Sequence, residues 1–399
     1  MTKPMDRFNH EKITFWFYQA QMVLLNSFSI AFSNVTSMSE NETLLSVEDL
    51  KAYFVSKKGY VKAVDGISFD IKKGECLGVL GESGCGKSSL ALAIIGLFDR
   101  VAKYAAGSSK DPRLRKKYEM GLDDEGDRPG VRGSVIFKGM DLTTLDDEKL
   151  VEIRGKQISM IPQGLTHALN PQYSVGYQTG EPIEIHDEDV RLIELKKRVL
   201  EYLNLVRIAD SGFRFVLDPS SFSGGEAQRI LIAMSLISGP YLVIADEPTS
   251  ALDVTIQRQI INVLRMVRDE FKVSLMLISH DAGVIAELAD RVAVMYAGKL
   301  MEVGDAVQMF HHPGHPYTMG LMSSFPTIAM MRMKAGGKKP RLRGIPGDPP
   351  DLTELPSGCP FHPRCSFAVE RCKIEVPENR EVEPRHWIRC HRYEEIKEE

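Results

Sequence analysis

Apolar and polar positions alternate along two early stretches of the chain. Residues 44–54 and 63–71 repeat with a period of two, which predicts half-buried β-strands. Shorter, mostly apolar runs are typical of parallel strands buried on both faces, and stretches with an apolar residue every three or four positions predict helices. The short runs are 76–80, 158–161, 241–245 and 273–278, and the helical stretches are 88–98, 182–217, 227–237 and 254–268. This alternation predicts a doubly wound α/β sheet with its ligands at the carboxyl ends of the strands.

The composition is that of an ordinary globular protein. The chain has 399 residues, 43% hydrophobic and 26% charged, and its 50 Lys and Arg against 54 Asp and Glu give a net charge of −4. This balance excludes wholesale disorder and does not suit a chain that grips nucleic acid, so we expect no nucleic-acid partner. Residues 15–32 approach the length of a membrane span but carry Gln and Asn, and we expect residues 1–40 to be a poorly ordered extension. Residues 99–132 lack periodicity and are expected to form a surface insertion.

A glycine-rich loop stands between the strand 76–80 and the helix that follows it. Its sequence, Gly81-Glu82-Ser83-Gly84-Cys85-Gly86-Lys87-Ser88, fits the pattern G-x-x-x-x-G-K-[ST]. In this pattern backbone N–H groups surround the phosphates, the lysine reaches the β- and γ-phosphates and the hydroxyl ligates Mg²⁺. The sequence therefore predicts a nucleoside triphosphate site with Mg²⁺. The predicted nucleotide-binding residues are Gly81, Ser83, Gly84, Cys85, Gly86, Lys87, Ser88 and Ser89.

Two acids, Asp246 and Glu247, end the apolar run 241–245. Nothing in that run explains the charges structurally. At the end of a strand beside the phosphate loop, Asp246 is expected to lie near the Mg²⁺ held by Ser88. Glu247 can turn toward the γ-phosphate there and accept a proton from an attacking water.

A second phosphate-binding helix start is predicted at Ser223-Gly224-Gly225-Glu226, directly before the apolar helix 227–237. One nucleotide cannot easily occupy both helix starts within one fold. At this point the residues resemble the ATP-binding-cassette family, in which the signature loop of one subunit closes over ATP held by the phosphate loop of another. The resemblance spans roughly residues 44–325.

The resemblance implies a P-loop NTPase fold, with a RecA-like core, an antiparallel β subdomain and a helical signature subdomain at about 164–240, in a domain covering 41–325. It implies that Glu247 is the general base, that His280 contacts the γ-phosphate, and that Gln163 senses Mg²⁺ and water. Ser88, Gln163 and Asp246 are the implied Mg²⁺ ligands, directly or through water, and Asp253 belongs to the D-loop 250–253. Phe54 is the expected stacking partner of adenine, with Tyr53 and Tyr60 as alternatives. Phe222 and Glu226 depart from the Leu and Gln common in the family, and we do not expect either to abolish function.

The last part of the chain, residues 326–399, is predicted to be a linker and a small Cys-rich domain. Its cysteines Cys359, Cys365, Cys372 and Cys390 follow the spacing C-x5-C-x6-C-x17-C, which can gather four thiolates around one metal centre but lacks the C-x2-C usual in zinc sites. Two disulfides would require an oxidising compartment. With residues 315–318 and 344–350, this tail resembles the ATP-binding subunits of dipeptide and oligopeptide importers. That resemblance implies a [4Fe–4S] cluster on the four cysteines; zinc, or no metal, are the alternatives.

The resemblance implies an ATP-hydrolysing subunit on the cytoplasmic face of the cell membrane. It would energise the import of peptides, or of a related small solute, through two separate permease subunits, served indirectly by an extracytoplasmic solute-binding protein. A homologous second ATPase subunit is the expected partner, and a homodimer is the alternative. Competing interpretations are a soluble mechanical ATPase, which predicts a coiled-coil insertion or tandem cassettes, and an ATP-binding assembly factor without turnover, against which Glu247 and His280 argue.

Overall fold

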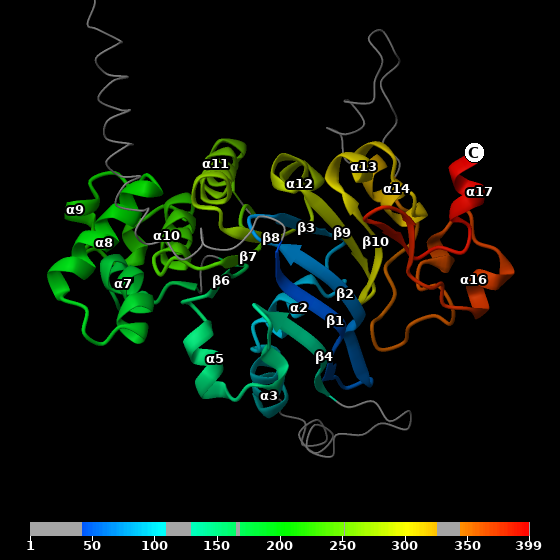
Figure 1. Cartoon of the computed structure of the whole chain (residues 1–399), viewed down its shortest axis with the longest axis horizontal. Coiled ribbons are helices and arrows are strands. Elements are labelled where there is room, and N and C mark those ends of the chain that lie inside the picture. The colour runs from blue at the N-terminus through cyan, green and yellow to red at the C-terminus, as the bar shows by residue number, and fades with distance from the viewer. Residues whose placement is uncertain (1–41, 109–128, 165–167, 251, 325–343, 399) are drawn as a thin grey trace, which may run out of the picture.

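Two β-sheets form the body of the chain (Figure 1). The computed structural model describes residues 42–108, 129–164, 168–250, 252–324 and 344–398. The predicted N-terminal extension, most of the predicted insertion at 99–132, Ala251 of the D-loop and the linker up to residue 343 lie outside the described residues.

The smaller sheet is antiparallel, with the strand order β2-β1-β4-β5. The first two strands confirm the period-two alternation, because buried and exposed side chains alternate along much of their length. This sheet is the antiparallel β subdomain that the resemblance implies. Its strands are β1 (Thr43–Val55), β2 (Tyr60–Lys72), β4 (Gly130–Phe137) and β5 (Met140–Asp141).

The larger sheet has the order β11-β12-β10-β9-β3-β8-β7-β6. Its five strands from β9 to β6 are parallel, and the other three pair antiparallel at one edge. The tail strands β11 and β12 therefore continue the sheet of the nucleotide domain. The strands are β3 (Cys76–Leu80), β6 (Ile158–Ile161), β7 (Leu242–Asp246), β8 (Ser274–Ser279), β9 (Arg291–Tyr296), β10 (Lys299–Asp305), β11 (Arg380–Glu383) and β12 (His386–Ile388).

Both faces of the parallel strands are buried, which explains their continuous apolar sequences. Along β7, Leu242 and Ile244 pack into the core between the two sheets, whereas Val243 and Ala245 pack into the core on the opposite face. Helix α2 (Lys87–Ile94) lies in the first core, and α11 (Val254–Phe271) packs in the second. Ligand-binding side chains are therefore confined to the ends of these strands.

The predicted helix over 88–98 is interrupted. Helix α2 ends at Ile94, and α3 begins at Phe98 and runs to Ser108. Gly96 between them has φ +66°, and the N–H of Leu97 donates to the carbonyl five residues earlier at 2.8 Å. This glycine-capped termination was missed because both helices place apolar residues on the same core.

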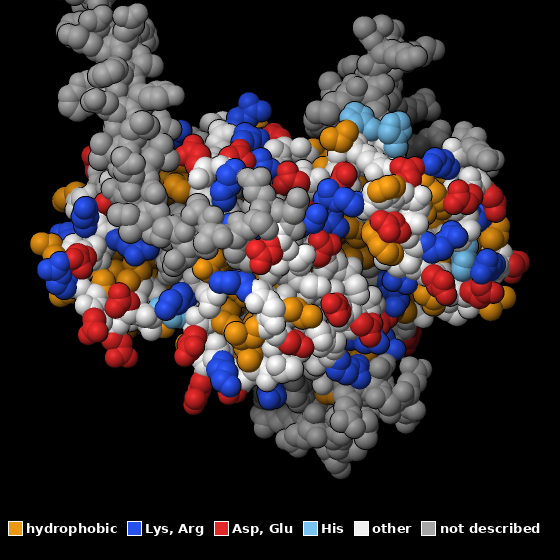
Figure 2. Space-filling model, in the orientation of Figure 1, with side chains coloured by type: hydrophobic (Ala, Val, Ile, Leu, Met, Phe, Trp, Pro, Cys, Tyr) orange, Lys and Arg blue, Asp and Glu red, His pale blue; other side chains and the backbone are white. Residues whose placement is uncertain are grey.

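The remaining helices form two groups. Those from 175 to 236 lie together beside the β6 edge, at the left of Figure 1, and most of the others border the second face of the sheet or belong to the tail, whereas the helix Asp147–Ile153 packs into the core between the two sheets. No helix within the described ranges is both long and apolar enough to cross a membrane. Acidic and basic side chains are interspersed over the face drawn in Figure 2. The helices are α5 (Asp147–Ile153), α7 (Val175–His186), α8 (Leu192–Leu205), α9 (Ser211–Arg214), α10 (Gly224–Leu236), α12 (Ala282–Leu288), α13 (Ala306–His311), α14 (Pro316–Ser323), α16 (Glu370–Ile374) and α17 (Tyr393–Glu398), with short 3₁₀ turns at Leu142–Thr144, Pro219–Ser221 and His362–Arg364.

Candidate nucleotide-binding site

The carboxyl ends of four neighbouring parallel strands bring the predicted site residues together. The phosphate loop follows β3, His280 follows β8, Asp246 ends β7, and Gln163 follows β6 by two residues. Because these strands are adjacent in the order β3-β8-β7-β6, residues far apart in sequence meet at one edge.

Glycines let the backbone of the phosphate loop close tightly. A Cβ atom on Gly86 would lie 1.9 Å from the carbonyl oxygen of Ala63, and one on Gly81 would lie 2.2 Å from that of Met295. Gly84 has φ +79° and no atom within 4 Å of its Cβ position, so this glycine meets open space. Gly86 is also the cap of α2 and has no side chain with which to occupy the N–H groups of the helix. A helix start without a side-chain cap leaves its N–H groups available to an anion, and phosphate binding by this loop stays a prediction.

Lys87 is buried across this loop. Its Nζ atom donates to the carbonyl oxygens of Gly81 at 2.8 Å and Glu82 at 2.9 Å. Phosphate oxygens would have to replace these carbonyl contacts when a nucleotide binds. Burial raises the pKa of the neighbouring Cys85 thiol, an effect that Lys87 opposes.

Asp246 and Ser88 fit a magnesium site. The Asp246 side chain is hydrogen-bonded by the Ser88 hydroxyl and the residue is only 2% exposed. Among the described residues, no donor reaches its Oδ1 atom. Burial raises the pKa of this carboxyl, as does Glu247, while the Ser88 bond and Lys87 lower it. A buried carboxylate oxygen without a partner, next to a hydroxyl, is a donor set that suits Mg²⁺.

Glu247 contacts both of the other predicted catalytic side chains. Its Oε2 accepts from Gln163 Nε2 at 2.9 Å, and its Oε1 lies 3.0 Å from His280 Nδ1. The residue has φ +50°, a conformation that a non-glycine residue seldom adopts. The left-handed backbone at Glu247 ends the alternation of side-chain directions along β7. In this conformation the Glu247 carboxylate contacts both Gln163 and His280.

The signature residues cap helix α10. Ser223 accepts from the N–H of Glu226 at 3.4 Å, and the Glu226 carboxylate accepts from the N–H of Ser223 at 2.9 Å, which forms a capping box. A Cβ on Gly225 would lie 2.6 Å from Ile256 Cγ2, so a glycine is needed where α10 meets α11.

Arg214 connects the two departures from the family pattern. Its Nη1 atom lies 2.5 Å from Glu226 Oε1, and its guanidinium lies 4.2 Å from the ring centre of Phe222. This pairing lowers the pKa of Glu226 to about 2, helped by the bonds from Ser223 and opposed by partial burial. Sequence reasoning missed Arg214 because no motif or periodicity links α9 to the signature loop.

The signature helix and the phosphate loop belong to different parts of the sheet. Helix α10 packs against β6 at the edge, whereas the phosphate loop follows β3, three strands further in. At about 4.8 Å per strand, these strands are roughly 14 Å apart. Asp253 caps α11 through bonds from Thr255 N and Ile256 N at 3.0 and 3.1 Å.

Of the three aromatic residues considered for adenine, Phe54 is the most accessible. Tyr53 and Tyr60 are buried at 2% and 6% exposure, whereas Phe54 is half-buried with its ring centre 6.2 Å from that of Phe98. This placement is compatible with a stacking surface at the rim of the smaller sheet.

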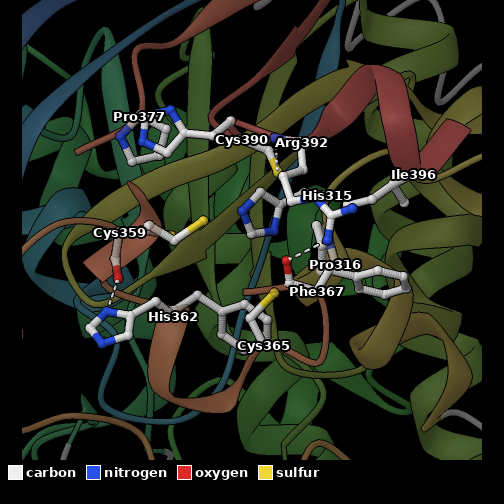
Figure 3. Close-up of a pocket in the computed structure, with 13 residues that line it drawn as sticks. His315, Pro316, Cys359, His362, Cys365, Phe367, Pro377, Cys390, Arg392 and Ile396 are labelled. Atoms are coloured by element: carbon white, nitrogen blue, oxygen red, sulfur yellow. Dashed lines mark hydrogen bonds between the residues drawn. The ribbon is translucent and has the colours of Figure 1, made fainter. Parts of the chain in front are cut away.

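The four tail cysteines line one pocket, together with His315 and Phe361. None is in a disulfide. Figure 3 shows the sulfur atoms of three of them facing the space between the labelled side chains. Within the described ranges, no group of three His, Cys, Asp or Glu side chains is arranged to hold a metal ion. The pocket cysteines are Cys359, Cys365, Cys372 and Cys390.

The pocket cysteines are buried or half-buried, and three of them receive backbone hydrogen bonds. Burial raises the pKa of Cys359 to about 12 and that of Cys390 to about 11. The N–H of Arg392 donates to Cys390 Sγ at 3.4 Å, and backbone groups of Phe361 and Phe367 bond Cys359 and Cys365. A thiol whose pKa is raised in this way keeps its proton unless a metal displaces it.

Two family models match this chain. One, described as "ABC transporter", matches residues 64–120 and 124–250, and the other, described as "Oligopeptide/dipeptide transporter, C-terminal region", matches residues 301–372. A probable peptide ABC transporter ATP-binding protein of Sinorhizobium fredii is 40% identical over 355 residues, which are 89% of this chain and 96% of the relative. The chain belongs to the peptide ABC transporter ATP-binding proteins.

A second relative matches over a similar length, and a solved structure shares the fold. The dipeptide transport ATP-binding protein of Bacillus subtilis is 42% identical over 349 residues, covering 88% of this chain and 94% of the relative. A solved dimeric ATP-binding cassette in a post-hydrolysis state, bound to ADP and phosphate, aligns with a TM-score of 0.53 at 21% identity over 66% of this chain and 98% of its own. The family resemblance and the P-loop α/β fold are therefore confirmed.

Proposed function

We propose that this chain hydrolyses ATP to power the import of peptides through separate membrane permease subunits. The observation that carries the proposal is the contact of Glu247 with both Gln163 and His280 at the edge that holds the phosphate loop. Relatives that align with most of this chain are named for peptide, oligopeptide and dipeptide transport.

In the proposed mechanism the chain positions charge rather than forming covalent bonds. The backbone of residues 81–89 and Lys87 hold the phosphates, with Phe54 against adenine. Ser88, Gln163 and Asp246 would hold Mg²⁺, which would neutralise phosphate charge when bound. Glu247 accepts the proton of the attacking water, and His280 contacts the γ-phosphate. Such positioning and electrostatic stabilisation provide most of the catalysis in phosphoryl transfer.

The proposed functional unit contains two cassettes. The strand that leads to the phosphate loop lies about 14 Å from the edge strand that supports the signature helix, which supports the completion of each site by Ser223, Gly224, Gly225 and Glu226 of a partner. We infer a homologous second ATPase subunit as that partner, two permeases, and indirect service by an extracytoplasmic solute-binding protein. This arrangement places the chain at the cytoplasmic face of the membrane.

We propose a [4Fe–4S] cluster for the thiol-lined pocket. Four cysteines around one cavity, with backbone N–H donors to three sulfurs, fit the ligand set and hydrogen bonding of such clusters. When bound, the cluster would supply a structural or one-electron redox centre.

The ATPase proposal is tested with Glu247→Gln. The variant should bind MgATP normally and hydrolyse it about 10²–10³-fold more slowly, and vesicles reconstituted with the permeases should lose ATP-dependent uptake of a labelled dipeptide. Gln172→Glu, on an exposed loop, is the control. Hydrolysis at the wild-type rate would refute the role of Glu247. A reconstituted complex that hydrolyses ATP but takes up no peptide would refute the substrate class.

The cluster proposal is tested by anaerobic purification. We expect about four irons and four acid-labile sulfides per chain, a broad visible absorbance, and their loss in Cys365→Ser. Cys76→Ser changes a cysteine outside the pocket and should retain the iron. A colourless protein that contains zinc, or no metal, would overturn the proposal.

A further inference from the structure

Arg364 joins the Cys-rich tail to the phosphate loop. It lies one residue before Cys365, and its side chain is only 5% exposed. Its Nη1 and Nη2 atoms lie 2.6 and 2.9 Å from the two carboxylate oxygens of Glu82, the second residue of the phosphate loop. Its Nε atom donates to the carbonyl of Pro346 at 2.8 Å. A two-pronged guanidinium–carboxylate pair of this kind fixes orientation as well as distance.

Glu82 is held at every polar group. Its carboxylate binds Arg364, its N–H donates to the Tyr317 hydroxyl at 3.0 Å, and its carbonyl accepts from Lys87 at 2.9 Å. The last bond involves the lysine that must turn to the phosphates. The position of Glu82 therefore sets the resting position of Lys87, and Arg364 helps to set the position of Glu82.

Aromatic packing reinforces this connection. The ring centres of Tyr296 and Tyr317 lie 4.6 Å apart, and Phe361 of the tail lies 5.3 Å from each. Arg364 also donates to the Tyr296 hydroxyl at 3.4 Å. Phe361 and Arg364 thus attach the thiol-lined pocket to the side chains that border the phosphate loop.

A second tail contact reaches the strands that carry Phe54. The N–H of Lys62 on β2 donates to the carbonyl of Leu352 at 3.1 Å, and Lys58 pairs with Asp351 at 2.6 Å. The tail therefore borders the nucleotide site at the phosphate loop and at the β1–β2 hairpin.

We propose that Arg364 is a positioning residue that couples the Cys-rich tail to MgATP binding through Glu82. The inference deepens the proposed function and rests on it only for ATP binding. Because coupling is reciprocal, tail docking and MgATP binding should each change the other by the same factor. Most measured couplings of this kind change affinity by about 5- to 150-fold.

The first experiment measures MgATP binding to the full chain. Arg364→Met should weaken affinity by about 5-fold or more and raise the KM for ATP, with a smaller change in kcat. Arg364→Lys keeps the positive charge but loses the two-pronged guanidinium, so its MgATP affinity should lie between those of Arg364→Met and the wild type. The control is Arg371→Met, which removes an exposed arginine of the same tail that pairs with the nearby Glu375. Equal affinity in Arg364→Met and wild type overturns the proposal.

The second experiment uses a readout other than activity. In the wild-type chain, MgATP should slow amide hydrogen exchange in residues 359–372, and Arg364→Met should abolish that protection while Arg371→Met keeps it. The tail has independent anchors, the β10–β12 pairing and the buried His386–Glu302 pair at 2.8 Å, so the variant is expected to fold. If it does not fold, absence of MgATP-dependent protection in the wild type still overturns the proposal. A wild-type chain that binds no MgATP at all would instead refute the proposed function.

Discussion

The two helix starts suited to phosphate, at α2 and at α10, hold their polar groups in opposite ways. The cap of α2 is Gly86, which offers no side chain, and the cation Lys87 rests on backbone carbonyl groups. The cap of α10 is Ser223, whose hydroxyl and N–H both bond to Glu226 of the same helix. One start is open to an anion, whereas the other already holds a carboxylate.

The acids beside these two helix starts differ in the same sense. Burial raises the pKa of Asp246, and one of its oxygens has no partner among the described residues. Arg214 lowers the pKa of Glu226 to about 2, so this carboxylate already has its cation. We expect the phosphate loop to bind MgATP alone, and the signature start to exchange its internal carboxylate for phosphate only when a second cassette closes.

The largest effect is expected at the open helix start. Lys87→Met removes the ammonium group that lies across the phosphate loop, so MgATP affinity should fall by about 100-fold or more. Titration of a fluorescent ATP analogue measures this loss. Lys156→Met, at an exposed position beyond the site, is the control. A loss of less than tenfold would mean that backbone donors alone hold the phosphates.

A smaller effect, confined to turnover, is expected at the signature start. Gly225→Ala pushes α10 from Ile256, where the Cβ would lie 2.6 Å from a methyl group. The variant should bind ATP as a single chain but hydrolyse it at least about tenfold more slowly, because the partner's nucleotide is no longer enclosed. Gly212→Ala on α9 adds a methyl group with no atom within 4 Å and should change neither quantity. Weakened binding in the isolated chain would contradict our separation of the two starts.

Local patterns predicted the parts of the site that lie on single elements. The buried strands could be predicted because both of their faces are covered, which makes their sequences continuously apolar. The phosphate loop could be predicted because its glycines, lysine and serine lie in one short segment. The contacts of Glu247 with Gln163 and His280 could not be predicted from a single element, because they depend on the order of β6, β7 and β8 in the sheet.

Contacts between distant segments could not be predicted. Arg364 and Glu82 are 282 residues apart, and neither belongs to a periodic pattern that points to the other. The tail strands β11 and β12 were also missed, because they are only 4 and 3 residues long and mostly polar or exposed. They become strands by pairing beside β10. Such features depend on tertiary packing rather than on local sequence.

Asp246 and Glu226 are also expected to contribute differently to the stability of the fold. The folded chain raises the pKa of Asp246 above its ordinary 3.8, so the folded state keeps this proton to higher pH than the unfolded state. Stability is therefore lost as pH rises above 3.8. Without Mg²⁺, Asp246→Asn should raise the Tm at pH 7.5, by roughly 1 °C for each kcal/mol gained in a chain of this length, and have little effect near pH 4. Asp290→Asn, at an exposed carboxylate, is the control for a lost charge. An Asp246→Asn variant less stable than wild type at pH 7.5 would show that the carboxylate has a cation partner in the folded chain.

The smallest effect is expected for Glu226→Gln. The amide keeps the shape of the capping box but loses the charge that pairs with Arg214 and repels phosphate. Pairs of this partly exposed kind contribute about 0.2–1 kcal/mol, so stability should fall slightly. The KM for ATP of the paired cassettes should fall by about two- to fivefold, because phosphate no longer displaces a carboxylate from Ser223. Glu201→Gln controls for the lost charge. Glu201 pairs with Lys197, and its side chain is 22% exposed compared with 21% for Glu226. A higher KM in Glu226→Gln would mean that the carboxylate orients Ser223 for the nucleotide instead of repelling phosphate. The two helix starts would then differ in when they bind phosphate, and not in the charge that each one holds.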